Sequence, residues 1–318
     1  AGLPAYLYGV TGVGKTSLIR HFLEKKEYFY VSALNTTPDD LESEKITAPV
    51  IVLDDLYAIS DIRLKDAYYQ KIQEWMERND LWVVLISRAP FPAWLLSLRM
   101  KYSFVMIGEE DFCLTREQQD EYLERYGLQV SEEQLEKAWA VGRGNPMSLR
   151  IFVMENGNLE AAMRTVWTYL ESNVYDQWDT ELQEFFMDIS IVKDFTVSLA
   201  AMITGNKHVE HMLAQGMETG NFFAKMGEKD GVWRCKDAMR WSMEQRLHKK
   251  RSPEQISRLY YNAGLYYEME GEIAKALEMY KVYDDTDSIF RLLVANAREN
   301  AAIGNYYELR NYYLELPE

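Results

Sequence analysis

Residues 9–16 of the chain are Gly9-Val10-Thr11-Gly12-Val13-Gly14-Lys15-Thr16. This octapeptide matches the phosphate-binding pattern G-x-x-x-x-G-K-[ST], whose glycines let backbone N–H groups converge on phosphate oxygens at a helix start. The apolar run Ala5–Tyr8 precedes it, and Leu18–Leu23 continues it with helical spacing. Strand, glycine-rich loop and amphipathic helix in this order are the context that the motif requires, which an ordinary glycine-rich turn lacks.

The segment before residue 110 alternates short apolar runs with helical patterns. The runs are rich in Val, Ile and aromatic residues, as buried parallel strands are. They are Ala5–Tyr8, Tyr28–Leu34, Pro49–Leu53, Leu81–Ser87 and Ser103–Ile107. Between the third and fourth runs, one helical face carries Leu64, Tyr68, Ile72, Trp75 and Met76. This alternation predicts a parallel α/β sheet with right-handed crossovers, a P-loop NTPase core over residues 1–112.

The apolar run Val50–Leu53 ends in two carboxylates, Asp54 and Asp55. Beside a phosphate loop, Lys15 is expected to reach the β- and γ-phosphates and Thr16 to ligate Mg²⁺. We expect Asp54 to hold Mg²⁺ directly or through water, and Asp55 to orient or deprotonate an attacking water. Because aspartate reaches less far than glutamate, we expect slow turnover. Without the phosphate loop, such a run is typical of a strand before a solvated turn.

Another predicted strand ends in Leu85-Ile86-Ser87-Arg88. Arg88 stands where a γ-phosphate sensor is expected, and the alternative is a surface arginine in a strand–helix loop. The candidate catalytic residues are thus Lys15, Asp54, Asp55 and Arg88. The candidate nucleotide-binding residues are Gly9, Val10, Thr11, Gly12, Val13, Gly14, Lys15, Thr16, Ser17 and Pro146. The candidate metal ligands are Thr16 and Asp54.

Helical patterns dominate from Leu114 onward. Two capping boxes mark helix starts, Thr115 with Gln118 and Ser131 with Gln134. A glycine-rich break, Gly142–Pro146, interrupts the pattern before helices resume. We therefore expect residues 113–178 to form a helical lid subdomain.

The next segment combines helices with a hairpin. Thr180 with Gln183 predicts the start of a helix over Leu182–Val192, and two short helices follow at Val197–Ile203 and His208–Thr219. The runs Phe222–Gly227 and Val232–Lys236 then flank Glu228–Gly231, a β-hairpin with an Asp-Gly turn. Three helices and a hairpin predict a winged helix over residues 179–250.

The remaining residues, 251–318, carry only helical patterns. Ser252-Pro253 with Gln255 is a strong helix start. The expected helices are Ile256–Glu270, Glu272–Tyr283, Thr286–Ala302 and Tyr306–Leu314, with Gly271 and Gly304 at turns. A spacing of about 30 residues resembles a tetratricopeptide-like solenoid, here truncated because two helix pairs are few for a free-standing array. The tyrosine-rich faces are more typical of helix packing than of a ligand site.

Composition limits the function further. The 318 residues, 47% hydrophobic and 27% charged, are typical of a soluble globular protein, and no apolar run approaches about 18 residues. A net charge of −15 disfavours a mainly nucleic-acid-binding role. The basic run Arg246–Arg251 ends a predicted helix, where cations offset the helix dipole. Cys113, Cys235 and four histidines form no metal-ligand pattern. We expect a part of a longer cytoplasmic protein.

These motifs in this order resemble one family. The phosphate loop, the Leu-Asp-Asp strand, the Ser-Arg strand end, the Gly144-Asn145-Pro146 break, a winged helix and tyrosine-rich repeats are similar to the signal-transduction ATPases with numerous domains (STAND). The chain most resembles the MalT-like regulators of the LuxR family. The likeness implies a nucleotide switch: ADP locks a closed monomer, and ATP with an inducer opens it for self-association. It also implies a DNA-binding domain beyond Glu318.

The resemblance also bears on single residues. It places Pro146 near the adenine and sugar, whereas a simple helix break is the alternative. It often implies a histidine after the wing, where this chain has Lys236 and Asp237. This difference puts the usual ADP lock in doubt, and Lys236 would be the residue to meet the β-phosphate instead.

The sequence therefore predicts an ATP/ADP- and Mg²⁺-binding switch module of a transcription regulator, with slow ATPase activity, a small-molecule or protein inducer at the helical repeats and no membrane partner. A continuously cycling AAA-type ATPase is the first alternative. A helical-repeat scaffold with a structural nucleotide is the second. Turnover rate separates the first alternative from the switch, because phosphoryl-transfer enzymes typically reach about 1–100 s⁻¹.

Overall fold

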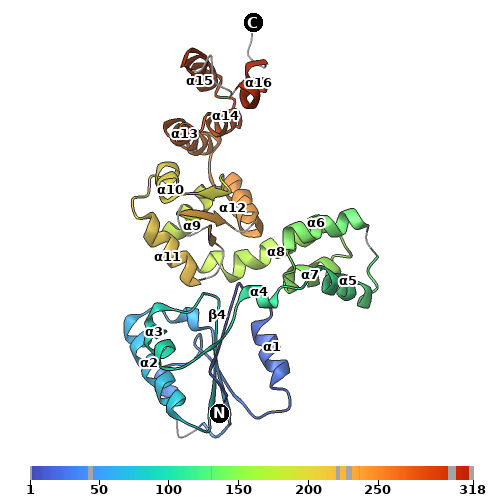
Figure 1. The fold of residues 1–318 in the computed structure, drawn as a ribbon, viewed down its shortest axis with the longest axis vertical. Coiled ribbons are helices and arrows are strands. Elements are labelled where there is room, and N and C mark those ends of the chain that lie inside the picture. Colours follow the sequence, from blue (N-terminus) through green and yellow to red (C-terminus); the bar gives the residue numbers. More distant parts are fainter. Residues whose placement is uncertain are drawn as a thin grey trace. The chain divides into compact units, whose positions relative to one another are not determined.

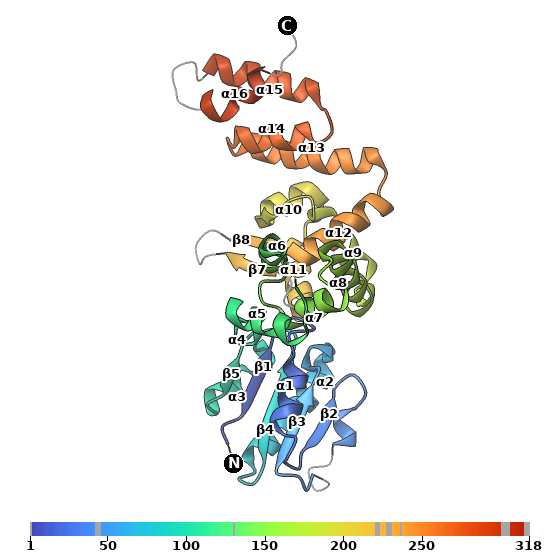
Figure 2. The same ribbon diagram turned by 90° about the vertical axis from the view of Figure 1, so that its right-hand side faces the viewer.

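The computed structural model describes residues 2–41, 46–129, 131–219, 223–226, 231–235, 237–299 and 306–314. The chain divides into two compact units. The first comprises Ala1–Gln177 and Ala214–Phe223, and the second comprises Trp178–Leu213 and Ala224–Glu318. Figures 1 and 2 show the elements of both units from two sides.

The first unit is built on a five-stranded parallel sheet. Its strands are β1 (Ala5–Tyr8), β2 (Phe29–Ser32), β3 (Val50–Asp54), β4 (Trp82–Ser87) and β5 (Val105–Ile107). Their order is β2-β3-β4-β1-β5, and all four neighbouring pairs are parallel. The predicted α/β core with a parallel sheet is confirmed, and the phosphate-loop strand β1 is flanked on both sides.

Helices cover both faces of this sheet. Helix α1 (Lys15–Phe22) lies on one face, and α2 (Ile62–Glu77) and α3 (Leu96–Lys101) lie on the other (Figure 1). Tyr68, Ile72 and Trp75 of α2 are buried, as predicted. Leu64, one turn earlier on the same helical face, is 40% exposed.

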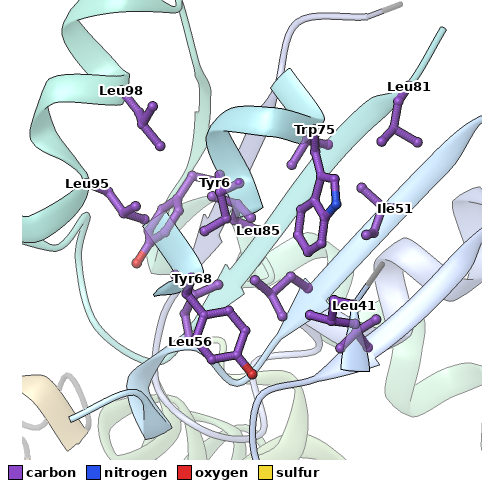
Figure 3. Packing of buried hydrophobic residues seen from close by; sticks show 14 of the residues in the cluster. Tyr6, Leu41, Ile51, Leu56, Tyr68, Trp75, Leu81, Leu85, Leu95 and Leu98 are labelled. Carbon is purple, nitrogen blue, oxygen red and sulfur yellow. The ribbon is translucent and has the colours of Figure 1, made fainter. Parts of the chain in front are cut away.

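The core on the α2 side joins strands to helices. Trp75 and Tyr68 pack with Tyr6, Ile51 and Leu85 from three strands (Figure 3). Complete burial of an aliphatic side chain such as Ile51 or Leu85 stabilises the fold by about 1.5–3 kcal/mol. Because this core fixes β1, β3 and β4 relative to one another, it holds their carboxyl ends, where the candidate site residues follow.

Strand β2 is shorter than the predicted run Tyr28–Leu34. It lies at the edge of the sheet, and its last sheet contact is the Ala33 N–H bonded to the Asp54 carbonyl at 3.0 Å. The chain then turns, with the Asn35 N–H donating to the Ser32 carbonyl at 3.1 Å. This turn ends the strand at Ser32.

The helical segment that follows the sheet has the predicted starts. It contains α4 (Glu109–Phe112), α5 (Arg116–Arg125), α6 (Glu132–Gly142), α7 (Pro146–Met154) and α8 (Leu159–Asn173). Both capping boxes, Thr115 with Gln118 and Ser131 with Gln134, are present. Among the described residues of this unit, the short 3-10 helices are η1 (Pro38–Asp40), η3 (Leu56–Ala58), η4 (Ala93–Leu95) and η5 (Tyr175–Gln177).

The glycine-rich break separates α6 from α7. Gly144 has φ +78°, and an added Cβ would lie 2.2 Å from the Leu114 carbonyl oxygen. The Leu114 N–H in turn donates to the Gly144 carbonyl at 2.8 Å. Glycine is therefore required here both by conformation and by the close approach of another backbone segment.

The second unit begins with the predicted mixture of helices and hairpin. Its elements are α9 (Thr180–Ile189), β6 (Asp194–Phe195), α10 (Val197–Thr204), α11 (Val209–Thr219, whose last residues belong to the first unit), β7 (Phe223–Met226), β8 (Val232–Cys235) and α12 (Asp237–Lys250). The strands form a sheet in the order β6-β8-β7. The hairpin residues Glu228–Asp230 and Lys236 lie outside the described residues.

Two details of this unit bear on the sequence predictions. The helix expected from Leu182 begins two residues earlier, because Asp179 caps it by accepting the Leu182 N–H at 2.8 Å. The interpretation of the basic run as a helix end is supported, since His248–Lys250 form the last turn of α12. Arg251 pairs with the Asp188 carboxylate at 2.9 Å.

The remaining elements are helical. They are α13 (Pro253–Met269), α14 (Ile273–Lys281), α15 (Thr286–Glu299) and α16 (Tyr306–Leu314). Ser252 and Gln255 form the predicted capping box, and Gly271 has φ +77° at the turn before α14. Gly304 lies outside the described residues. Among the helices described, we find none with the length and apolar character needed to span a membrane.

Candidate nucleotide-binding site

The loop between β1 and α1 has the conformation that its glycines permit. Gly9, Gly12 and Gly14 all have positive φ, at +153°, +84° and +100°. An added Cβ on Gly12 would lie 2.3 Å from the sulfur of Met147. Residues with a side chain rarely adopt these angles. The last of these glycines, Gly14, immediately precedes α1, whose first residue is Lys15.

Lys15 folds back over the loop. It is buried, and its Nζ donates to the carbonyls of Gly9 at 2.7 Å and Val10 at 3.1 Å. Burial lowers the pKa of Lys15 to about 8, against the opposing effect of the Asp54 carboxylate. A phosphate beside this amine would add negative charge and so favour its protonated form.

Asp54 ends β3 and is almost fully buried. Its Oδ2 accepts hydrogen bonds from Thr16 Oγ1 at 2.7 Å and from the Tyr30 hydroxyl at 2.8 Å. Its Oδ1 accepts the Asp55 N–H at 2.7 Å. A hydroxyl and a carboxylate oxygen side by side are the hard oxygen donors that Mg²⁺ prefers, so the residues present fit that ion.

Asp55 adopts a different geometry from its neighbour. Its φ is +60°, in the left-handed region that non-glycine residues seldom occupy. Its Oδ2 accepts a hydrogen bond from Ser32 Oγ at 2.6 Å. Burial raises the pKa of Asp55, and the Ser32 hydrogen bond partly offsets this. Backbone conformations of this strained kind are found most often at functional sites. Here the left-handed conformation directs the Asp55 side chain to a different partner from that of Asp54.

Arg88 follows β4 and turns toward the same pocket. Its guanidinium lies 4.0 Å from the centre of the Tyr57 ring, and its Nη1 donates to the Asn173 carbonyl at 3.1 Å. Burial raises the pKa of Tyr57, with Arg88 opposing the effect. Arg88 is half-buried and contacts both the Tyr57 ring and the Asn173 carbonyl, which argues against the alternative of a solvated surface arginine.

These groups line one pocket of about 260 Å³. Its walls are formed by Thr11, Gly12, Gly14, Lys15, Thr16, Ser17, Asp54, Asp55, Tyr57, Ser87, Arg88 and Tyr169. The structure thus brings the four candidate catalytic residues together with the second half of the phosphate loop. Gly9, Val10 and Val13 belong to the loop without lining the pocket.

Pro146 does not line this pocket. It is the first residue of α7, capped by Asn145, which accepts the N–H groups of Met147 and Ser148 at 3.0 and 3.1 Å. Its neighbour Met147 is the residue that packs against Gly12. The helix-break interpretation of Pro146 fits its position, and a contact with nucleotide stays a prediction.

Sequence reasoning missed several residues of the site. The Tyr169 hydroxyl on α8 lies 3.2 Å from Thr11 Oγ1, and Tyr57 and Ser87 complete the pocket wall. Tyr30, also missed, sits beneath Arg20, whose guanidinium is 4.9 Å from its ring centre. Two of them carried a signal: Tyr57 stands two residues after the paired carboxylates, and Ser87 precedes Arg88 at a predicted strand end.

Comparisons with known proteins show what the chain as a whole is similar to. Residues 171–256 match the family described as the MalT winged helix domain. The HTH-type transcriptional regulator MalT of Vibrio campbellii is 22% identical over 259 residues, which are 76% of this chain and 28% of the relative. MalT of Vibrio parahaemolyticus is 20% identical, again over 76% of this chain and 28% of the relative. The chain thus spans little more than a quarter of these relatives.

A solved structure supports the fold. A Walker-type ATPase of Pyrococcus abyssi has a TM-score of 0.55 and 14% identity, over 75% of this chain and 90% of that one. The parallel sheet with its phosphate loop, the winged-helix match and the MalT relatives lead to the same conclusion: this chain is similar to MalT-like P-loop ATPase regulators and carries a MalT-type winged helix.

Proposed function

We propose that this chain is the nucleotide-binding switch module of a longer, cytoplasmic, MalT-like transcription regulator of the STAND class. It would bind ATP and ADP with Mg²⁺ and hydrolyse ATP slowly. The observation that carries the proposal is the convergence of Lys15, Thr16, Asp54, Asp55 and Arg88 on one pocket at the carboxyl ends of parallel strands. Ligands bind at this edge in open α/β sheets.

The residues would divide the chemistry among them. Lys15 would exchange its loop carbonyls for phosphate oxygens, and Thr16 and Asp54 would hold Mg²⁺, which neutralises phosphate charge when bound. Asp55 would orient a water whose oxygen attacks the γ-phosphorus, and it would take up a proton as the bond to the bridging oxygen breaks and ADP leaves. Arg88 would donate to the terminal phosphate. The short reach of Asp55 supports slow turnover.

The switch itself needs two states with different nucleotide affinities. A ligand shifts an equilibrium only by its differential affinity for the two states. Moving a population from 1:99 to 99:1 takes about 5.5 kcal/mol. One additional phosphate would not easily supply this difference, so a second ligand is part of the proposal. In the activated state the protein would self-associate, and DNA would be bound through a domain outside this chain.

The helical repeats are the proposed place for that inducer. In the second unit, a groove of about 280 Å³ between α13 and α14 is lined by tyrosines. These are Tyr260, Tyr261, Tyr280 and Tyr283, with Glu254, Arg258 and Asp285 beside them. Aromatic faces with a few charged groups are typical of small-molecule sites, which supports the assignment.

The decisive experiment is calorimetric titration of the chain and of Lys15→Ala with ADP and with ATP. We expect binding by the chain and none by the variant, with identical circular dichroism. Unchanged affinity in a folded variant would refute the assignment. Denaturing the purified protein and identifying released nucleotide by chromatography then shows which nucleotide it retains.

Turnover and shape separate the switch from the two alternatives. A cycling AAA-type ATPase would approach about 1–100 s⁻¹, whereas we expect a much slower rate. Small-angle scattering in ADP and in a non-hydrolysable ATP analogue, each with candidate inducers, should change the radius of gyration or the oligomeric state. An unchanged shape in every condition would favour a scaffold with a structural nucleotide.

A further inference from the structure

The edge strand β2 presents two hydroxyl side chains to the site. Val31 is buried in the core on the α2 side of the sheet. Because successive side chains of a strand point to opposite faces, Tyr30 and Ser32 share the other face. Strand register places Tyr30 beside Val52 and Ser32 beside Asp54. The strand therefore carries both hydroxyls along the side of β3 on which the phosphate loop lies.

Each hydroxyl serves a different carboxylate. The Tyr30 hydroxyl donates to Asp54 Oδ2 at 2.8 Å, and the Ser32 hydroxyl donates to Asp55 Oδ2 at 2.6 Å. The Ser32 bond, at 2.6 Å, lies in the range typical of hydroxyl bonds to a charged acceptor, and the Tyr30 bond, at 2.8 Å, has the usual length of a hydrogen bond between oxygens. The two donors stand two residues apart on one strand, and the two acceptors are adjacent on the next.

We propose that β2 is the positioning strand of the nucleotide site, in which Tyr30 orients the metal-binding carboxylate of Asp54 and Ser32 orients the water-activating carboxylate of Asp55. This inference rests on the proposed function and deepens it. Neither hydroxyl lines the pocket, so both act through the carboxylates that they hold.

The remaining hydrogen bonds explain why the strand is needed. Apart from Tyr30, Asp54 is held by Thr16 and by the Asp55 N–H. Thr16 belongs to the nucleotide-binding loop and is itself a proposed metal ligand. Its hydroxyl would therefore both bind the metal and hydrogen-bond to Asp54. Tyr30 comes from the sheet and is independent of that loop. The bond to Ser32 likewise ties the side chain of Asp55, whose backbone is left-handed, to the sheet.

The first test is Tyr30→Phe, which removes one hydroxyl and keeps the ring beneath Arg20. ADP and ATP affinities are measured by calorimetry with Mg²⁺ and with EDTA. We expect unchanged affinity in EDTA and a 10- to 100-fold loss, roughly, in apparent Mg²⁺ affinity, as for other groups that orient metal ligands. The matched control is Tyr28→Phe, since Tyr28 is two residues earlier and contacts neither carboxylate; it should behave as wild type.

The second test is Ser32→Ala, which removes the other hydroxyl. We expect nucleotide and Mg²⁺ affinities to stay at wild-type values while single-turnover hydrolysis slows about 10- to 100-fold, the cost of a displaced catalytic group. Ser32→Thr keeps a hydroxyl at the same position and should restore most of the rate. A loss of rate that the threonine does not restore would contradict a role for the hydrogen bond.

The outcomes separate this inference from the function on which it rests. If Lys15→Ala binds nucleotide like wild type, the proposed function fails. If Lys15→Ala loses binding while Tyr30→Phe and Ser32→Ala match wild type in Mg²⁺ affinity and rate, only the positioning strand fails. Equal weakening of Tyr30→Phe with Mg²⁺ and with EDTA would show a merely structural role and would also overturn the proposal.

Discussion

Binding of nucleotide should draw a proton onto Lys15. Its amine is buried against the carbonyls of Gly9 and Val10, and its pKa is lowered from 10.5 to about 8. A nearby phosphate favours the charged amine and raises this pKa again. The protein is therefore partly deprotonated at this position before binding and fully protonated afterwards.

The size of the effect follows from the pKa. At pH 8 about half of the Lys15 amines are neutral, so binding should take up roughly 0.5 proton, against roughly 0.1 at pH 7. If the bound pKa lies well above 9, metal-free ADP should bind about tenfold more weakly at pH 9 than at pH 7. The phosphate groups of ADP contribute little at pH 8 and 9, because a group with a pKa near 6 is about 10% protonated at pH 7 and about 1% at pH 8.

The assay is calorimetric titration with ADP in EDTA, at pH 7, 8 and 9, in buffers of different ionisation enthalpy. The slope of observed enthalpy against buffer enthalpy gives the number of protons taken up. A slope near zero at pH 8, with affinity constant to pH 9, would show that Lys15 is charged before binding and would refute the reasoning from its burial.

Three further outcomes are expected. Asp54→Ala should weaken Mg²⁺-dependent ATP binding in calorimetry, whereas Asp55→Asn should spare binding and slow hydrolysis; equal effects of both changes on both quantities would contradict their separate roles. Gly264→Ala should lower the unfolding temperature, because its Cβ would lie 2.5 Å from the Tyr280 ring and overpacking costs about 1–3 kcal/mol; a higher temperature would show that the ring gives way. The chain, with net charge −15 and Lys207 as the sole Lys or Arg of Val197–Thr219, should show no sequence-specific DNA binding in fluorescence anisotropy at near-physiological salt.

The sequence predicted the parts of the site that are contiguous along the chain. The phosphate loop and the carboxylate pair Asp54-Asp55 each follow an apolar run, so their placement at strand ends could be inferred from local pattern alone. The same reasoning found Arg88. It did not find Tyr57 or Tyr169, whose nearness to the loop depends on how separate segments fold together.

The edge strand illustrates the limit most clearly. Tyr30 and Ser32 matter because β2 pairs with β3, and strand order cannot be inferred from residue spacing. The cap of α9 shows a smaller limit, since Asp179 and Thr180 are both good caps and only the backbone geometry decides between them. Capping residues and apolar runs predicted the individual helices and strands. Which side chains come into contact depends on how those helices and strands pair.

The contact between Arg88 and Asn173 links the end of α8 to a residue of the pocket wall. Asn173 is the last residue of that helix, and its carbonyl is one of those that a helix leaves without an internal partner. An N–H group that moves to a phosphate is withdrawn from this carbonyl. On the proposed function, a terminal phosphate that takes the Nη1 group of Arg88 would leave this carbonyl to water, so that two nucleotides would differ in the hydrogen bonding at the end of α8.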